Sequence, residues 1–259
     1  MRFFALHFFR LSPLRDLCAY ALTMLALGWL LVHGAETSGY TWQWSRVSAF
    51  FLRPDGSWGP LLHGLGLTVI LSALGLLGAT GVALMTVLLR LSRSWLGQAL
   101  ARIYLETIRN TPLLVQIFFI YFVFAPWIGL GRMASAVLAL SLFEGAYASE
   151  VLRASILAIP KGQWEAAQSL GMPRFSVYTQ VILPQAVRLA LPPLTSQGVS
   201  LIKDSALVST IAIMDLTMQA QIIVAETFLS FEIWFTVAAL YLLLTGTVSL
   251  LARQLENKR

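Results

Sequence analysis

Apolar residues form long stretches along the chain, and four of these stretches contain no Asp, Glu, Lys or Arg. They cover residues 17–35, 56–89, 110–131 and 233–252. A helix needs about 20 apolar residues to cross the hydrocarbon core of a bilayer, so each stretch is long enough for a membrane span. Two apolar segments that carry a few charges complete a set of six predicted spans, at residues 17–32, 61–89, 113–128, 133–157, 189–208 and 233–251.

The amino-acid composition also indicates a membrane protein. Of the 259 residues, 58% are hydrophobic and only 12% are charged, whereas soluble proteins carry about 25% charged residues. Too little polar surface remains to cover a water-soluble globule, so we expect an all-α fold, a polytopic membrane helix bundle. The single cysteine, Cys18, lies inside the first apolar stretch, which excludes an intramolecular disulfide.

The positive charges are distributed unevenly between the two sides of the predicted membrane. With the N-terminus in the cytoplasm, fourteen of the 18 Lys and Arg residues fall in inside segments, several of them in residues 90–112 between the second and third spans. This asymmetry follows the positive-inside rule and predicts that both termini are cytoplasmic. The net charge of +6 therefore reflects topology, and no nucleic-acid partner is expected. The outside segments keep only Arg46, Arg53, Arg132 and Lys203.

The first apolar stretch allows two interpretations. Arg2, Arg10 and Arg15 precede it and a small-residue site lies near residues 32–35, as in a signal peptide. The stretch is also long enough for a span, and we favour a helix that is retained. The loop that follows is rich in aromatic residues of the kind that anchor at membrane interfaces: Tyr40, Trp42, Trp44 and Trp58.

Local residue patterns predict how two of the spans pack and begin. Small residues are frequent in residues 61–89, including the pair Gly75 and Ala79, so this span is expected to pack closely against other helices. Before the third span, Asn110 or Thr111 is expected to cap the helix, with Pro112 in its first turn.

Residues 159–184 form a segment that is too polar to span the membrane. Pro160 can open a helix, and Gly171 followed by Pro173 can end one, which predicts a surface helix over residues 161–170. An apolar stripe of Trp164, Ala167 and either Leu170 or Gly171 would lie beside Glu165 and Gln168. Such a helix could rest on lipid, or its small side chains could dock into a groove of another protein.

Several residues of this segment resemble a known motif. Glu165-Ala166-Ala167, Gly171 and Ile182-Leu183-Pro184 are similar to the cytoplasmic EAA loop of the membrane subunits of bacterial ABC importers, with Val181 in place of the usual isoleucine. The resemblance implies that the loop at 160–185 couples this chain to an ATP-binding subunit. The implied coupling residues are Trp164, Glu165, Ala166, Ala167, Gly171, Leu183 and Pro184.

Residues 106–116, 146–153, 181–186 and 201–209 narrow the resemblance to the permeases of polar amino acid uptake systems of the histidine, glutamine and glutamate type. The resemblance implies an importer transmembrane domain over residues 60–253, with an additional helix and loop in residues 1–59 and a short cytoplasmic tail at 254–259. It also implies the bacterial inner membrane as the location. The implied partners are two ATP-binding subunits, a second identical or homologous permease, and a periplasmic or lipid-anchored substrate-binding protein.

The chain contains no motif for ATP hydrolysis or for metal-dependent catalysis. A P-loop requires Gly-Lys-Ser/Thr, which is absent, so ATP and Mg are expected on the partner ATPase and no cofactor on this chain. The only histidines, His7, His33 and His63, lack the spacing of a metalloprotease motif, so an enzyme is not expected. An ion-gradient-driven transporter or a structural subunit stays an alternative, although inverted repeats are not visible.

Charged residues inside spans are expensive and are therefore candidates for function. Glu144, Lys203 and Asp204 either line the translocation path of a zwitterionic substrate or form structural ion pairs. Because neighbours on a helix point about 100° apart, Lys203 and Asp204 are each expected to find a partner on another helix. Glu150 and Arg153 are spaced for an ion pair on the helix surface.

Overall fold

The computed structural model describes residues 13–37 and 39–257, and its internal contacts divide the chain into two units. The smaller unit ends at Trp44 and contains α1 (Pro13–Thr37). The described side chains of α1 are exposed and mostly apolar, as expected for a helix that contacts lipid. The larger unit begins at Ser45, so the second half of the Trp-rich loop belongs with it, whereas the sequence placed the boundary after residue 59.

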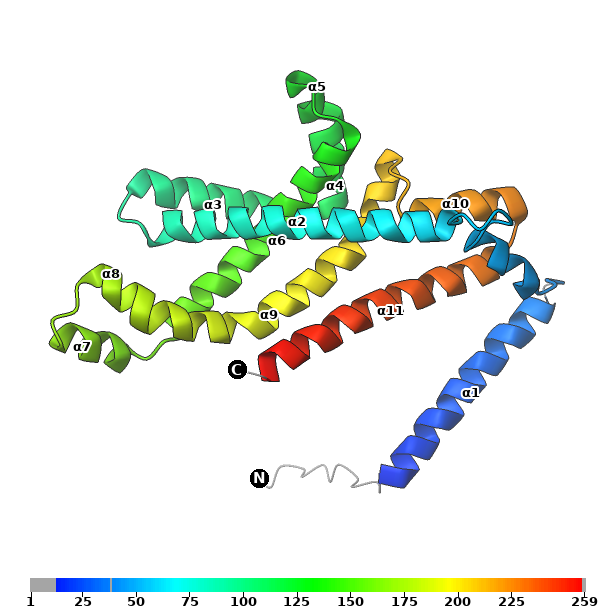
Figure 1. Cartoon of the computed structure of the whole chain (residues 1–259), viewed down its shortest axis with the longest axis horizontal. Coiled ribbons are helices and arrows are strands. Elements are labelled where there is room, and N and C mark those ends of the chain that lie inside the picture. Colours follow the sequence, from blue (N-terminus) through cyan, green and yellow to red (C-terminus); the bar gives the residue numbers. More distant parts are fainter. Residues whose placement is uncertain (1–12, 38, 258–259) are drawn as a thin grey trace, which may run out of the picture. The chain divides into compact units, whose positions relative to one another are not determined.

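The larger unit is helical, and the described residues contain only one isolated β-bridge, between Leu52 and Trp58. Figure 1 shows α2, α9 and α11 running along its length, with α7 and α8 at one end and α10 at the other. The elements are η1 (Trp44–Phe50), α2 (Pro60–Leu91), α3 (Trp95–Arg109), α4 (Leu113–Phe118), η2 (Phe119–Phe124), α5 (Ala125–Ile128), α6 (Arg132–Leu157), α7 (Lys161–Ser169), α8 (Arg174–Ser176), η3 (Val177–Ile182), α9 (Leu183–Asp204), η4 (Ser205–Ile211), α10 (Leu216–Thr227) and α11 (Ser230–Asn257).

Four helices of the described chain are long and apolar enough to cross a membrane, and six spans result if each of two bent helix pairs counts as one. The four are α1, α2, α6 and α11, which match the first, second, fourth and sixth predicted spans. The other two predicted spans, residues 113–128 and 189–208, lie in helices that pass as spans only together with a bent neighbour. α3 meets the helix at residues 113–128 at 110°, and the helix that ends in η4 meets α10 at 51°.

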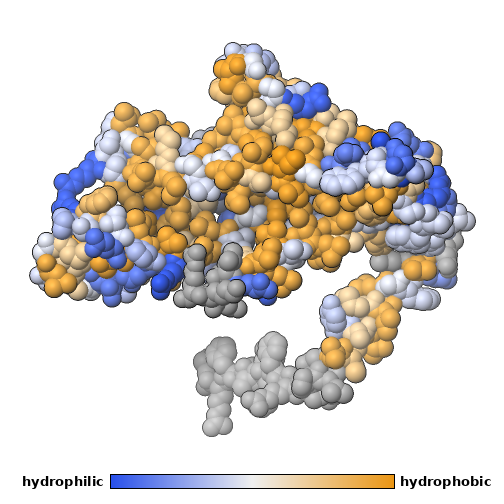
Figure 2. Space-filling model, viewed as in Figure 1, coloured by the Kyte–Doolittle hydropathy of each residue, from blue (hydrophilic) through white to orange (hydrophobic). Residues whose placement is uncertain are grey.

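The surface of the larger unit agrees with this arrangement. Figure 2 shows hydrophobic residues across the middle of the larger unit on the visible face, with hydrophilic residues gathered mainly at its two ends. Exposed apolar side chains are stable where lipid surrounds them, and polar side chains are stable where the headgroups and water begin. The long direction of α2 therefore runs between two polar ends through an apolar zone.

α2 and α6 form the most extensive helix pair, because small residues let their backbones approach. A Cβ atom added at Gly145 of α6 would lie 2.8 Å from Val82 Cβ of α2, and Ser141 Oγ donates to Gly75 O at 3.3 Å. Gly75 and Ala79 both lie in the contact and are buried. The predicted close packing of the second span is therefore confirmed.

Replacing Gly78 by alanine is expected to destabilise the α2–α6 contact. The added methyl group would lie 2.8 Å from Ser141 Cβ and closer still to Ser141 Oγ, and overpacking of this kind costs about 1–3 kcal/mol. Gly81→Ala is the matched control, because nothing lies within 4 Å of its added Cβ. Thermal unfolding of the purified chain in detergent should show a lower transition temperature for Gly78→Ala than for Gly81→Ala, and equal temperatures would contradict the close contact.

Two π-helical turns lie just before prolines within otherwise continuous helical segments. η2 ends two residues before Pro126, and η3 ends two residues before Pro184. Proline lacks a backbone N–H and its ring clashes with the carbonyl four residues earlier, so a wider turn relieves the clash. The Leu183-Pro184 pair thus has a local structural role, which is to carry the chain from the loop into α9.

α3 and α10 were not anticipated as helices. Asn110 ends α3 rather than capping the next helix, because its Nδ2 donates to Glu106 O at 2.8 Å, while Thr111 Oγ1 donates to Thr107 O at 2.9 Å. Pro112 is the N-cap of α4 and contributes no side-chain cap. The predicted capping roles of Asn110 and Thr111 at the third span were therefore wrong.

α10 folds back onto the start of α2. Asp215 caps α10 by accepting from Met218 N at 2.9 Å, and Leu216 N donates to Thr68 Oγ1 of α2 at 3.2 Å. A Cβ atom at Gly64 would lie 2.8 Å from the Cα atom of Leu216, so this approach requires glycine. Residues 209–232, which separate the fifth and sixth predicted spans, therefore pack partly against α2 as a part of the bundle.

Candidate functional site

The surface helix predicted at residues 161–170 is present as α7, which spans Lys161–Ser169. It ends in a Schellman motif: Gly171 N donates to Gln168 O at 2.9 Å, and Met172 N donates to Ala167 O at 3.3 Å. Gly171 has φ of +72°, a backbone conformation that other residues rarely adopt. Gly171 therefore fixes the direction in which the chain leaves α7.

One side of α7 packs against the rest of the larger unit. Trp164 meets Tyr178 of η3 edge to face, with ring centroids 5.0 Å apart. Ala167 is only 4% exposed and belongs to an apolar cluster that includes Val87 of α2 and Ile156 of α6. Ala167 therefore packs α7 against the rest of the bundle and does not face outward as a docking residue.

The predicted apolar stripe on α7 is only partly correct. Trp164 and Ala167 face the cluster, but Leu170 is exposed, because the left-handed Gly171 turns the chain away at the end of the helix. Tyr178 is the main contact that sequence reasoning missed. Its position fourteen residues after Trp164 gives no periodic signal, since α7 and η3 are separate elements.

The opposite side of α7 remains exposed. Glu165 and Ala166 are exposed on the helix, and Gly171, Leu183 and Pro184 are exposed beside it. Ser169 Oγ donates to the backbone carbonyl of Glu165 at 2.9 Å, so this hydrogen bond does not involve the Glu165 carboxylate. The structure thus presents a rigid helix with a carboxylate between small side chains, at one end of the larger unit (Figure 1).

A basic groove of about 330 Å³ lies beside α7. Trp164 and Gln168 form its wall on α7, and Arg93 and Arg174 also line it. A protein partner that binds α7 would meet these positive charges next to Glu165. Such mixed charges provide specificity for a complementary surface.

The ends of α2 and α6 near α7 are joined by an ion-pair network. Glu150 of α6 pairs with Arg153 at 3.3 Å, as the sequence predicted, and it also pairs with Arg90 of α2. The Arg90 contact was missed, because the two residues are distant in sequence and meet only when α2 and α6 pack. The network connects the two central helices at the end of the bundle that carries α7.

Two acidic side chains meet in the interior of the bundle. Glu144 lies near the middle of α6 and is only 2% exposed, and its carboxyl group lies close to that of Asp204 at the end of α9. Glu144 Oε2 has no hydrogen-bond partner, so the pair retains free acceptor capacity.

Lys203 is next to Asp204 in the sequence but is not part of this pair. Its side chain is exposed, whereas Asp204 is half-buried and directed to α6. Among the described residues Asp204 forms no ion pair with a base on another helix, and its neighbour on α6 is the acid Glu144. The arrangement places two carboxyl groups together with a lysine on the adjacent residue, which suits a ligand with an amino and a carboxylate group.

Comparisons with known sequences identify relatives over most of the chain. Residues 81–259 match the family described as "Binding-protein-dependent transport system inner membrane component". The chain is 37% identical over 201 residues to the glutamine transport system permease protein GlnP of Escherichia coli (strain K12), covering 76% of this chain and 92% of the relative. It is 38% identical over 226 residues to the L-cystine transport system permease protein TcyB of Bacillus subtilis (strain 168), covering 86% and 94%.

Solved structures agree with these relatives. The crystal structure of an amino acid ABC transporter with histidines superposes with a TM-score of 0.73 at 36% identity, covering 77% of this chain and 94% of the other. An inward-facing methionine ABC transporter, MetNI, has a TM-score of 0.66 at 17% identity, covering 77% and 95%, which shows the shared fold alone. The chain therefore belongs to the family of binding-protein-dependent transport system inner membrane components and is a membrane permease subunit of an ABC importer, not an enzyme.

Proposed function

We propose that this permease carries polar amino acids and that the Glu144–Asp204 pair contributes to the path they follow. The relatives named for glutamine and cystine transport support this substrate class. Two neighbouring carboxyl groups, one buried and one half-buried, are expensive inside a membrane bundle. The pair becomes favourable when it accepts hydrogen bonds from the ammonium group of an amino acid, while Lys203 on the next residue suits the carboxylate.

α7 is the element through which a separate ATPase acts on the permease. The exposed Glu165 with small neighbours supports docking into a cleft of an ATP-binding subunit, which would hold ATP and Mg. In this orientation the end of the bundle that carries α7 is cytoplasmic. Because α7 packs on residues of α2, α6 and η3, a displacement of α7 would be transmitted to the spans.

A second permease subunit, identical or homologous, completes the path, and a periplasmic or lipid-anchored binding protein delivers the substrate. The helix at residues 113–128 projects from the bundle in Figure 1 and exposes Phe119, Phe122 and Trp127. An exposed aromatic surface of this kind supports contact with another membrane subunit or with lipid. Two ATP-binding subunits would match the two permeases.

Reconstitution of the permease with its ATPase and binding protein in proteoliposomes tests this function. We expect ATP-dependent uptake of a polar amino acid such as glutamine or cystine, and stimulation of ATP hydrolysis by the same amino acid. A sugar and a divalent cation serve as control solutes. Uptake that an ion gradient drives without ATP, or stimulation by the control solutes alone, would contradict the proposal.

A further inference from the structure

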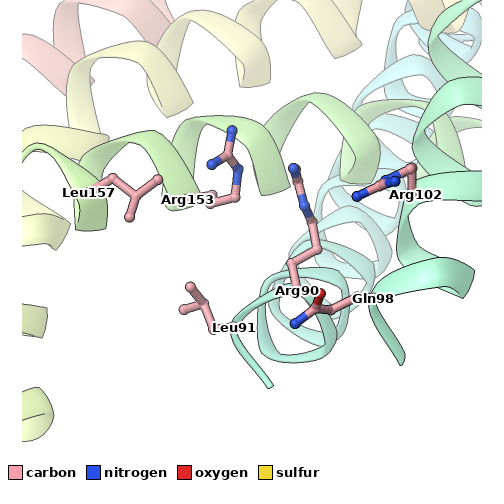
Figure 3. Close-up of a pocket in the computed structure, with 6 residues that line it drawn as sticks. All are labelled: Arg90, Leu91, Gln98, Arg102, Arg153 and Leu157. Atoms are coloured by element: carbon pink, nitrogen blue, oxygen red, sulfur yellow. The ribbon is translucent and has the colours of Figure 1, made fainter. Parts of the chain in front are cut away.

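Three arginines line a cavity that neither α7 nor the acidic pair uses. The cavity has a volume of about 270 Å³ and lies between the ends of α2 and α6 and the start of α3. Figure 3 shows Arg90, Arg102 and Arg153 around it, each from a different helix. No acidic residue lines the cavity. Its remaining lining residues are Leu91, Gln98 and Leu157.

The positive charge of this cavity is only partly balanced by the chain itself. Glu150 pairs with both Arg90 and Arg153, so one carboxylate serves two guanidinium groups. Arg153 Nε is buried and has no hydrogen-bond partner. Arg102 is exposed and extends toward Arg90 across the cavity in Figure 3. The cavity thus offers unused donors and a net positive charge, which is the arrangement that binds an anion.

The surroundings of the cavity indicate where such an anion comes from. On α3, Leu96, Leu100 and Ile103 are exposed at spacings of four and three, so they form an apolar face beside Arg102. Trp95 at the start of α3 is 81% exposed, as is typical of residues that lie at the headgroup level of a membrane. Arginines that meet a lipid-facing apolar surface are suited to a lipid headgroup, since the acyl chains can follow the apolar face.

We propose that this cavity binds the phosphate of an anionic phospholipid. Guanidinium groups form paired hydrogen bonds with phosphate oxygens, and basic pockets between helices at the cytoplasmic side of membrane proteins bind acidic headgroups. The lipid phosphate would accept hydrogen bonds from the exposed guanidinium group of Arg102 and from the partly exposed one of Arg153. It would also hold α3 against the α2–α6 pair, next to the end of the bundle that carries α7.

Native mass spectrometry of the purified full-length chain in detergent tests this site. Phosphatidylglycerol and phosphatidylcholine are titrated separately, and inorganic phosphate is added as a competitor. We expect phosphatidylglycerol to bind more tightly than phosphatidylcholine, and Arg102→Gln to weaken its binding about fivefold, the effect of one basic residue at an anionic surface. Arg188→Gln, an equal charge change at an exposed position of α9 outside the cavity, should leave binding unchanged.

Three results would overturn the proposal. The first is equal binding of the two lipids by the unmodified chain, a comparison that does not depend on any variant folding. The second is an equal effect of Arg102→Gln and Arg188→Gln, which would indicate a general charge effect. The third is complete displacement of phosphatidylglycerol by millimolar inorganic phosphate, which would identify a soluble phosphate as the ligand.

Discussion

Replacing Glu165 by lysine is expected to abolish ATP-driven uptake while the chain still folds and inserts. The Glu165 side chain is exposed, and the hydrogen bond from Ser169 Oγ uses the backbone carbonyl of Glu165, so the permease itself should tolerate the change. At an interface, the loss of a hydrogen-bonded charge costs roughly 2–5 kcal/mol, which is more than about thirtyfold in affinity. Co-purification with the ATPase and uptake in proteoliposomes measure the two consequences.

Glu226→Lys is the matched control for this prediction. Glu226 is an exposed glutamate on α10, at the opposite end of the larger unit from α7 (Figure 1). The same charge reversal there should leave both ATPase binding and uptake unchanged. If Glu165→Lys retains normal uptake, α7 is not the element that couples the permease to ATP hydrolysis.

The sequence predicted the elements whose physical requirements are local. A membrane span needs a continuous apolar run, so α2, α6 and α11 could be placed from hydropathy alone. α7 could be placed because Pro160 and Gly171 determine where a helix can begin and end. These features depend on residues within one segment and can therefore be predicted without knowledge of the fold.

α3 was missed because it has no continuous apolar run. Its polar residues Gln98 and Arg102 interrupt the sequence, and only the spacing of Leu96, Leu100 and Ile103 reveals an amphipathic helix. A search for helical periodicity in residues 95–109 would have found it. The apolar face of α3 could then have been recognised, with Arg102 beside it.

The contacts between distant helices could not be predicted from one sequence. Glu144 and Asp204 meet because α6 packs against α9, and Ala167 turns inward because α7 rests on the ends of α2 and α6. Each of these contacts depends on how helices pack, and hydropathy does not specify packing partners. Glu144 and Asp204 could be identified as candidates because a charged side chain costs free energy inside a membrane. The residues that they contact could be assigned only from the structure.

Neutralising the acidic pair is expected to impair transport without preventing assembly. Glu144→Gln and Asp204→Asn keep the size of each side chain but remove the carboxylate that we propose to bind the substrate ammonium group. A charge-assisted hydrogen bond contributes about 1.5–3 kcal/mol, so the substrate concentration for half-maximal uptake should rise about tenfold to a hundredfold. Uptake by the reconstituted transporter measures this change, and ATP hydrolysis without substrate should persist.

Asp215→Asn is the control for this experiment, because Asp215 is also a buried acid. Its carboxylate caps α10, and asparagine caps a helix about as well as aspartate, so this variant should transport normally. If Glu144→Gln and Asp204→Asn also transport with an unchanged half-maximal concentration, the pair serves only to pack α6 against α9. A rise for the pair alone would place the amino group of the substrate between these two helices, since no other change in the series removes a negative charge from that position.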